Sequence, residues 1–396
     1  MKQTWRWFGP DDLVLLPHVK QAGATGIVTA LHHMNRGQAW TDDEVQKRKG
    51  EIEAAGLTWD VCESIAVPEN IKTRSGNFRE LIENYKASLR AIGKAGIKIA
   101  CYNFMAITDW TRTDLMWPLA NGGSALRFDM IDFCAYDVLI LKRRNAEADH
   151  PPARITAAKA RIATWPESKM AELERNLIDW VPAREAVYDR VSFNRQLDAY
   201  RDISLEGMRQ NLFEFVGEIA PVAEEADVKL AIHPDDPPFS LFGLPRVNST
   251  ADDTRKLLAA VDTPTNGVTL CTGSYGANPV NDLVAMAKEF GPRIHFTHLR
   301  NTTHEEDGSF YEAEHLDGDT DMIGVVAALQ DEEVRRRAEG RADHEIPMRP
   351  DHGHLIVDDI GKNVNPGYSC IGRLKGLAEL RGVMRTVARF RTEPNL

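Results

Sequence analysis

Short apolar runs rich in β-branched residues recur along the chain, and segments with a helical pattern separate most of them. We expect eight strands, at residues 4–9, 25–33, 58–65, 97–104, 228–234, 267–273, 293–301 and 345–353. Eight strands that alternate with helices are typical of a parallel (β/α)8 TIM barrel. A doubly wound open sheet is the alternative, but the count of eight favours the barrel. The pattern therefore predicts one α/β barrel domain over residues 1–396.

Residues 111–203 interrupt this alternation between the fourth and fifth predicted strands. The segment is rich in charged residues and helix formers, as in AKARIATWPESKMAELERNLIDW, and it has few strand signals. We expect a helical insertion outside the barrel, acting as a lid or an oligomer contact. Ser204 then suits the N-cap of the next barrel helix. One apolar face of that helix is expected to hold Leu205, Met208, Leu212, Val216 and Ile219.

Composition narrows the function classes. A net charge of −11 leaves no electrostatic basis for binding nucleic acid. No run of 18 apolar residues occurs, and the first residues, MKQTWRWFGPDD, lack the apolar core of a secretory signal. Five scattered cysteines argue against a disulfide framework and for a reducing compartment. We therefore expect a cytoplasmic protein that binds neither a membrane nor nucleic acid.

Four consecutive predicted strands end in side chains that can bind a metal ion, namely His233, Cys271, His298 and Asp351. Catalytic groups of such barrels gather at the carboxyl ends of the strands. Each residue alone has an ordinary explanation, such as a hydrogen-bonded histidine, a small buried cysteine or an aspartate N-cap. Four of them on adjacent strands are typical of a single site. A thiolate argues against Mg²⁺ and Ca²⁺, and leaves Zn²⁺, Fe²⁺, Mn²⁺ and Co²⁺ possible.

The seventh predicted strand contains two histidines, and strand alternation places them on opposite faces. Phe296, His298 and Arg300 share one face, while His295 lies on the other. His298 is nearer the carboxyl end of the strand and is the expected ligand, with His295 as the alternative.

Two further residues suit proton transfer. His352 directly follows Asp351 and can act as a general acid or base near neutral pH. Its alternative role is to hold the loop or to orient a ligand. Tyr368 lies in a Pro-Gly turn before the last helix, where it either packs or faces the barrel mouth.

The remaining strand ends carry polar groups for a substrate. Arginines bind carboxylates well, although each one can equally form a structural ion pair. The residues expected to contact a substrate are His32, Glu63, Asn103, Arg112, Arg300 and Arg349.

Several motifs resemble the mannonate dehydratase (UxuA) family of the xylose-isomerase-like barrel group. They span residues 29–382 and read TALHH, ESI, NFMAITDWTRTDL, AIHPDDPPFSLFGLPR, CTGSYG, HFTHLRN, RPDHGH and NPGYSCIGRLKGLAELRG. One departure is ESIAVPENIK, where the family more usually has ESIPVHEDIK, so that Pro68 replaces a histidine.

The resemblance implies dehydration of D-mannonate to 2-keto-3-deoxy-D-gluconate and water in hexuronate (glucuronate) catabolism, with Mn²⁺ or Fe²⁺ as the metal. It implies a homo-oligomer, a dimer or larger, and carries the family's metal ligands onto His233, Cys271, His298 and Asp351. It carries the acid and base onto His352 and Tyr368, without deciding which is the base.

Other functions fit the residues taken without the resemblance. A sugar isomerase or epimerase of the same barrel group also uses a divalent metal, although a cysteine ligand is less typical there. A metal-dependent hydrolase or phosphodiesterase would often gather two or three ions, and a non-catalytic binding barrel would not need His352 and Tyr368. The residues make dehydration feasible, and the resemblance selects it.

Overall fold

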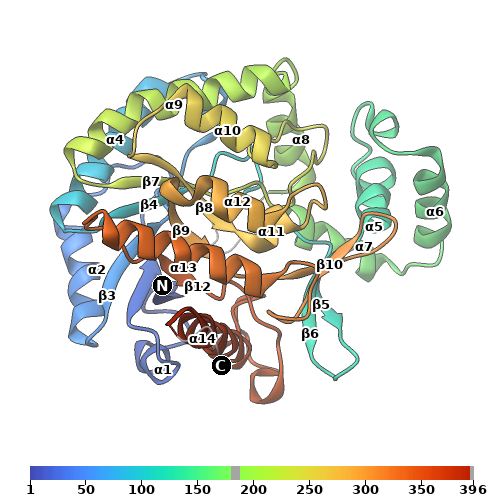
Figure 1. The fold of residues 1–396 in the computed structure, drawn as a ribbon. Coiled ribbons are helices and arrows are strands. Elements are labelled where there is room, and N and C mark those ends of the chain that lie inside the picture. The colour runs from blue at the N-terminus through green and yellow to red at the C-terminus, as the bar shows by residue number, and fades with distance from the viewer. Residues whose placement is uncertain (180–187, 393–396) are drawn as a thin grey trace.

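The computed structural model describes residues 1–179 and 188–392. Its centre is a closed barrel of eight parallel strands, which neighbour one another in chain order (Figure 1). These strands are β1 Lys2–Arg6, β2 Gly26–Thr29, β3 Thr58–Glu63, β4 Ile99–Tyr102, β7 Lys229–Ile232, β8 Asn266–Cys271, β9 Ile294–His298 and β12 Pro347–Arg349. Each overlaps one of the eight predicted runs, so the predicted (β/α)8 barrel is confirmed.

The described α-helices surround the barrel, apart from α5 to α7, which stand beside it (Figure 1). They are α1 Leu16–Gln21, α2 Asp42–Ala54, α3 Glu69–Thr73, α4 Phe78–Lys94, α5 Met130–Cys134, α6 Pro152–Ile162, α7 Glu167–Glu174, α8 Arg190–Ala199, α9 Leu205–Glu225, α10 Ala251–Ala260, α11 Thr272–Gly276, α12 Leu283–Phe290, α13 Met322–Ala338 and α14 Cys370–Thr392. None of these described helices is long and apolar enough to cross a membrane.

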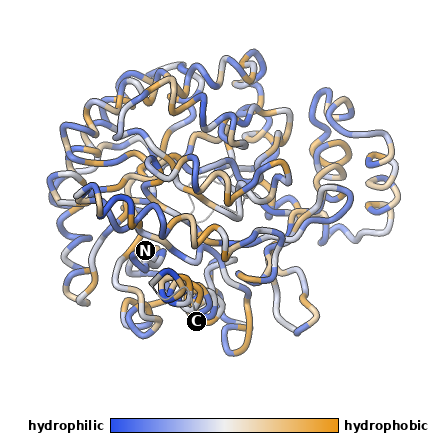
Figure 2. Tube along the Cα trace, viewed as in Figure 1, coloured by the Kyte–Doolittle hydropathy of each residue, from blue (hydrophilic) through white to orange (hydrophobic). Residues whose placement is uncertain are grey.

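Apolar side chains fill the interior of the barrel. Successive strand residues point to opposite faces, so alternate positions of different strands meet inside the barrel. One such cluster consists of Val28, Val61, Ile99, Cys101, Ala231 and Phe296. In Figure 2 the central strands carry much of the hydrophobic colour, while hydrophilic colour runs along the outer helices. Because side chains fill the interior of the barrel, a binding site is expected at the ends of the strands.

Helix α9 begins as the sequence predicts. The Ser204 side chain accepts a hydrogen bond from the backbone N–H of Gly207, which satisfies a donor that the first turn leaves free. The predicted apolar face is buried at Met208, Leu212, Val216 and Ile219, whereas Leu205 is 48% exposed.

The insertion predicted over residues 111–203 is mostly helical, with α5 to α8, of which α5, α6 and α7 stand beside the barrel (Figure 1). Residues 180–187 lie outside the described part. The insertion begins with a hairpin that the sequence pattern did not indicate, formed by β5 Asp114–Pro118 and β6 Ser124–Phe128. Its connection contains Asn121 and Gly122, and the φ of +85° at Gly122 explains the glycine.

The hairpin belongs to a second, smaller sheet. Strand β6 pairs with β11 Phe310–Glu312, which pairs with β10 Thr302–His304, all antiparallel. Aromatic contacts reinforce these pairs, since the Phe128 and Phe310 rings lie 5.9 Å apart. The sheet therefore joins the segments that follow β4 and β9, and it brings Glu312 toward the barrel mouth.

Candidate active site

A pocket of about 70 Å³ opens at the carboxyl ends of the barrel strands. It is lined by Arg6, Glu63, Ser64, Asn103, Asp109, Trp110, His233, Asp236, Arg300, Arg349, Asp351, His352 and Tyr368. Eight of the twelve residues expected from the sequence are in this lining. The other four are Cys271 and His298, which lie beside His233, and Arg112 and His32, which lie elsewhere.

Three of the expected metal ligands meet at one point. Ligand atoms of His233, Cys271 and His298 all lie within 4.8 Å of one another. Asp351 stands beside them, with Oδ2 3.5 Å from the Cys271 Sγ and Oδ1 3.9 Å from the His298 Nδ1. The ends of β7, β8, β9 and β12 thus supply one cluster of two nitrogens, one sulfur and one carboxylate. The alternative ligand, His295, lines a different pocket with Lys2 and Lys229 at the opposite ends of the strands.

The rings of His233 and His298 lie within hydrogen-bond distance of each other. His233 Nδ1 donates to the carbonyl oxygen of Pro234 at 2.7 Å, which leaves Nε2 as an acceptor. Burial lowers the pKa of His233, so this ring is neutral at pH 7. Its Nε2 lies 3.2 Å from His298 Nδ1, while His298 Nε2 lies 3.5 Å from Glu63 Oε2. Tetrahedral bonds of about 2.0–2.1 Å, as for Zn²⁺, place two ligand nitrogens about 3.3 Å apart. The donor set fits a divalent transition metal.

Asp351 is held in an uncommon backbone conformation, with φ at +67°, which aspartate adopts more readily than most residues. Its carboxylate contacts Arg349 and lies 3.3 Å from the Arg300 Nη1. Burial opposes ionisation, but the charges of Arg349 and Arg300 outweigh it and hold the pKa of Asp351 well below its usual range. The carboxylate is therefore ionised and able to bind a cation.

His352 lies against two aromatic rings, those of Tyr368 at 4.9 Å and Trp110 at 5.8 Å between centroids. Its Nδ1 lies 2.8 Å from Glu312 Oε2, a residue outside the expected set. A Cβ at Gly367, whose φ is +80°, would lie 2.9 Å from the His352 Cγ, which explains the glycine before Tyr368.

Tyr368 is 7% exposed. Burial raises its pKa to about 12, with the nearby Arg349 opposing this shift. The phenol is thus protonated at neutral pH.

The three expected carboxylate-binding arginines differ in position. Arg349 and Arg300 line the pocket, although each also pairs with an acid: Arg349 Nη2 lies 2.8 Å from Glu63 Oε1, and Arg300 contacts Asp236. Arg112 lies behind the wall, where its Nη1 donates to Asp236 at 2.6 Å. It is fully buried and cannot reach a substrate in the pocket without movement.

Close packing behind the wall also explains the glycine of the CTG motif. A Cβ at Gly273 would lie 1.9 Å from the Arg300 Nε, so only glycine leaves room for this arginine. Arg300 is thereby fixed between β8 and the pocket.

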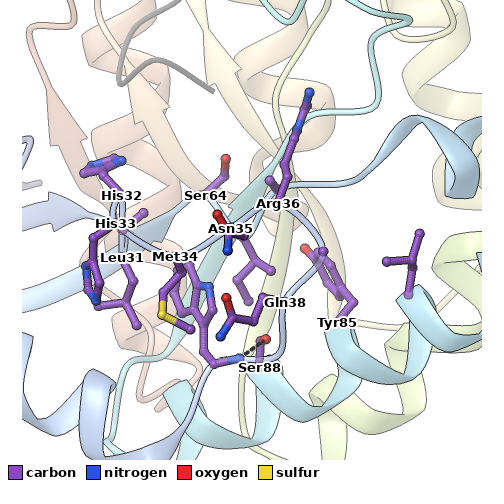
Figure 3. A pocket seen from close by; sticks show the side chains of 16 residues that line it. Leu31, His32, His33, Met34, Asn35, Arg36, Gln38, Ser64, Tyr85 and Ser88 are labelled. Atoms are coloured by element: carbon purple, nitrogen blue, oxygen red, sulfur yellow. Dashed lines mark hydrogen bonds between the residues drawn. The ribbon is translucent and has the colours of Figure 1, made fainter. Parts of the chain in front are cut away.

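His32 lies in a neighbouring cavity of about 220 Å³, formed by the loops that follow β2 and β3 (Figure 3). Burial and the charges of Arg6 and Arg48 lower its pKa well below the usual value. The cavity is lined mostly by residues 30–38, with Trp40, Ser64, Ile65, Ala66, Leu81, Tyr85 and Ser88. Ser64 borders both this cavity and the catalytic pocket. Pro68, where the motif departs from the family pattern, lines neither.

Two atoms in this cavity have unused hydrogen-bonding capacity. His32 Nε2 and the hydroxyl of Tyr85 are buried and have no hydrogen-bond partner in the part of the chain that is described. Asn35 and Gln38, labelled in Figure 3, also line the cavity and give it neutral amide groups.

Arg6, Asp236 and Glu312 are among the site residues that the sequence reasoning did not single out. Arg6 ends β1, and the strand-end rule that found the other residues would have found it. Asp236 lies three residues after His233, in the loop that follows β7, and Glu312 lies on β11, outside the barrel. No local sequence signal marks either of them.

Comparisons with known proteins match nearly the whole chain. The family model for D-mannonate dehydratase (UxuA) matches residues 1–393. A mannonate dehydratase of Saccharophagus degradans is 56% identical over 388 residues, which is 98% of each chain. Mannonate dehydratase 2 of Agrobacterium fabrum is 54% identical over 389 residues, again 98% of each chain. A crystal structure of mannonate dehydratase from Streptococcus suis is similar with a TM-score of 0.78 and 35% identity, and the match covers 99% of this chain and 95% of that one.

Proposed function

Since the chain belongs to the D-mannonate dehydratase family and is an enzyme of that activity, we propose that it performs the dehydration with one divalent transition metal ion. The ion would be bound by His233, Cys271, His298 and Asp351. The observation that carries this proposal is the convergence of those four donors, from four adjacent strands, beside His352 and Tyr368. Two imidazoles, a thiolate and a carboxylate suit Mn²⁺ or Fe²⁺, the metals that the family resemblance implies.

Dehydration of D-mannonate removes the proton from C2 and the hydroxyl from C3. The C2–H and C3–O bonds break, water leaves, and the resulting enol becomes 2-keto-3-deoxy-D-gluconate, an intermediate of hexuronate catabolism. When bound, the ion supplies Lewis-acid polarisation of a substrate oxygen. The protein must supply one group that accepts the C2 proton and another that donates a proton to the leaving hydroxyl.

We assign the acceptor role to His352 and the donor role to Tyr368. With Nδ1 next to the carboxylate of Glu312, His352 has Nε2 free to accept a proton. Tyr368 has a pKa raised to about 12, so it begins the reaction protonated. The two rings are in contact at 4.9 Å, close enough to act on adjacent carbons.

Residues that line the pocket are suited to bind different parts of the substrate. Arg300 and Arg349 are proposed to bind the carboxylate, with Glu63 and Asn103 beside them and with Arg6 as an addition to the set expected from the sequence. The pocket at the strand ends, with a volume of about 70 Å³, is smaller than the neighbouring cavity of about 220 Å³.

The hydroxyls on C4 to C6 are therefore proposed to enter the neighbouring cavity of about 220 Å³, past the shared Ser64. There His32 and Tyr85 have unused hydrogen-bonding groups for a neutral polyol.

The reaction is tested by proton NMR of the enzyme with D-mannonate in heavy water. A dehydratase yields a 3-deoxy keto acid, in which C3 keeps its one proton and takes up one deuteron from the solvent as the enol becomes the ketone, so one new C3–H signal appears upfield. An isomerase or epimerase of the same barrel group would keep an oxygen on C3, and that product would contradict the proposal.

The cellular setting is also proposed rather than measured. All five cysteines are free thiols, which supports a reducing compartment such as the cytoplasm. The expected homo-oligomer stays a prediction, which sedimentation of the purified chain checks.

A further inference from the structure

Glu312 reaches the active site from outside the barrel. It ends β11 in the small sheet, and its residue is 3% exposed. Both carboxylate oxygens face one atom of the proposed base, since Oε1 lies 2.9 Å and Oε2 2.8 Å from the His352 Nδ1. The backbone carbonyl of Glu312 also accepts a hydrogen bond from His354 Nε2 at 2.8 Å. Glu312 thus contacts both histidines of the RPDHGH motif, His352 through its carboxylate and His354 through its backbone carbonyl.

Two buried arginines fix the Glu312 carboxylate. Arg112 Nη2 donates to Oε1 at 2.9 Å, and Arg300 Nη1 lies 3.2 Å from the same oxygen. Arg112 is itself held by Asp236 at 2.6 Å. Burial opposes ionisation of Glu312, but the neighbouring positive charges outweigh it and lower the pKa to about 2. The carboxylate is ionised, rigid and able only to accept hydrogen bonds.

This arrangement favours one nitrogen of His352 as the one that carries hydrogen. Two groups approach Nδ1: the Glu312 carboxylate, which only accepts, with its two oxygens at 2.9 and 2.8 Å, and the Arg300 Nη1, which only donates, at 2.9 Å. The two carboxylate oxygens favour an N–H at Nδ1, and in the neutral ring Nε2 then has the lone pair. It lies 3.8 Å from Asp351 Oδ1, on the side of the candidate metal centre.

We propose that Glu312 is a positioning residue, which fixes the tautomer and orientation of His352 so that Nε2 faces the substrate C2 proton. The inference rests on the proposed function, because it presumes that His352 is the base. It also gives the small sheet a purpose, since β11 carries the carboxylate to the barrel mouth. The principle is the same as for the aspartate of serine proteases, which holds a histidine without touching the substrate.

The substitution Glu312→Gln tests this with almost no change in shape. Both arginines approach Oε1, so the amide oxygen of glutamine turns toward them and the NH₂ group faces His352 Nδ1. Nδ1 then accepts, and Nε2 carries the hydrogen in the wrong tautomer. We expect kcat for D-mannonate to fall about 10³–10⁴-fold, as when such an orienting carboxylate becomes an amide elsewhere, while KM stays within about threefold.

The variant Glu314→Gln is the matched control. Glu314 follows two residues later and pairs with Lys375 at 2.6 Å and with His354 at 3.4 Å, but it does not contact His352. This control is expected to retain kcat. Nitrogen-15 NMR of histidine-labelled protein gives a second readout, in which the protonated nitrogen of His352 moves from Nδ1 in the wild type to Nε2 in the Glu312→Gln variant.

Three results separate the hypotheses. A Glu312→Gln protein with wild-type kcat would overturn the positioning role. Loss of bound metal or of the folded state in parallel with activity would also overturn it, because a structural role would then explain the loss. If the His352→Asn variant stays active, His352 is not the base. That result would contradict the proposed function, and it is independent of any result obtained with Glu312.

Discussion

His233 Nε2 and His298 Nδ1 face each other at 3.2 Å, beside Cys271. The backbone carbonyl of Pro234 accepts the Nδ1 hydrogen of His233, so its Nε2 has a lone pair toward His298. A distance of 3.2 Å is also close to the spacing of two nitrogen ligands on one tetrahedral ion. This relationship supports the proposed metal site at the ends of β7 and β9.

Cys271→Ser should strip the metal from the site. A hydroxyl is a much weaker ligand than a thiolate for a borderline transition ion, so the bound metal should fall far below one ion per chain. Elemental analysis of the purified variant measures this. Cys370→Ser is the control, since Cys370 begins α14 away from the cluster, and it should keep its metal. Full metal retention in Cys271→Ser would contradict the assigned site.

Tyr368→Phe should abolish most activity without affecting the fold. Losing one proton transfer typically costs about 10²–10⁴-fold in kcat. The metal content should not change, because Tyr368 is not a proposed ligand. Steady-state kinetics and elemental analysis of the same preparation check both points, and a variant with near wild-type kcat would remove Tyr368 from the mechanism.

Tyr85→Phe should weaken substrate binding while leaving the protein as stable or slightly more stable. The Tyr85 hydroxyl is buried without a partner in the described structure, so its removal relieves an unsatisfied group. One hydrogen bond to the substrate is worth about 0.5–1.5 kcal/mol, which predicts an increase of about 2–10-fold in KM for D-mannonate.

A four-carbon 2,3-dihydroxy acid serves as the control ligand, because it lacks C5 and C6. Its inhibition constant should be nearly the same for wild type and for Tyr85→Phe. An equal loss of affinity for both acids would show that the cavity beside Ser64 does not bind the distal hydroxyls.

The inserted helices should lose stability as the pH rises from 6.5 to above 9. Burial lowers the pKa of His150, but its hydrogen bond to Asp137 at 2.9 Å and its contact with Cys134 outweigh this and raise the pKa to about 9. A histidine whose pKa is raised in the folded state stabilises that state fully at pH values below its unfolded pKa of about 6.5. This contribution to the free energy of unfolding is lost as the pH rises through the folded-state pKa.

Hydrogen exchange of α6, measured across this pH range, tests the effect. Exchange should quicken with pH more in the wild type than in His150→Gln, after correction for the intrinsic rate. Identical pH dependence in both proteins would contradict the role given to His150.

The features that could be predicted from the sequence are those that depend on a local pattern of residues. The apolar runs of the barrel strands and the position of a side chain at a strand end are both local, which is why the meeting of His233, Cys271 and His298 could be anticipated. The short strands of the small sheet were missed, because three to five residues show too little periodicity. The pairing of Arg112 with Glu312 joins residues 200 positions apart, and no spacing in the chain encodes it.

The central claim is that one metal ion at the His233–Cys271–His298–Asp351 cluster supports the dehydration. The most direct test removes metal with a chelator, adds back Mn²⁺ in measured steps, and follows formation of the keto acid from D-mannonate. The account predicts negligible turnover by the metal-free protein and recovery that saturates at one ion per chain. Full turnover without metal, or recovery only at two or more ions per chain, would contradict it.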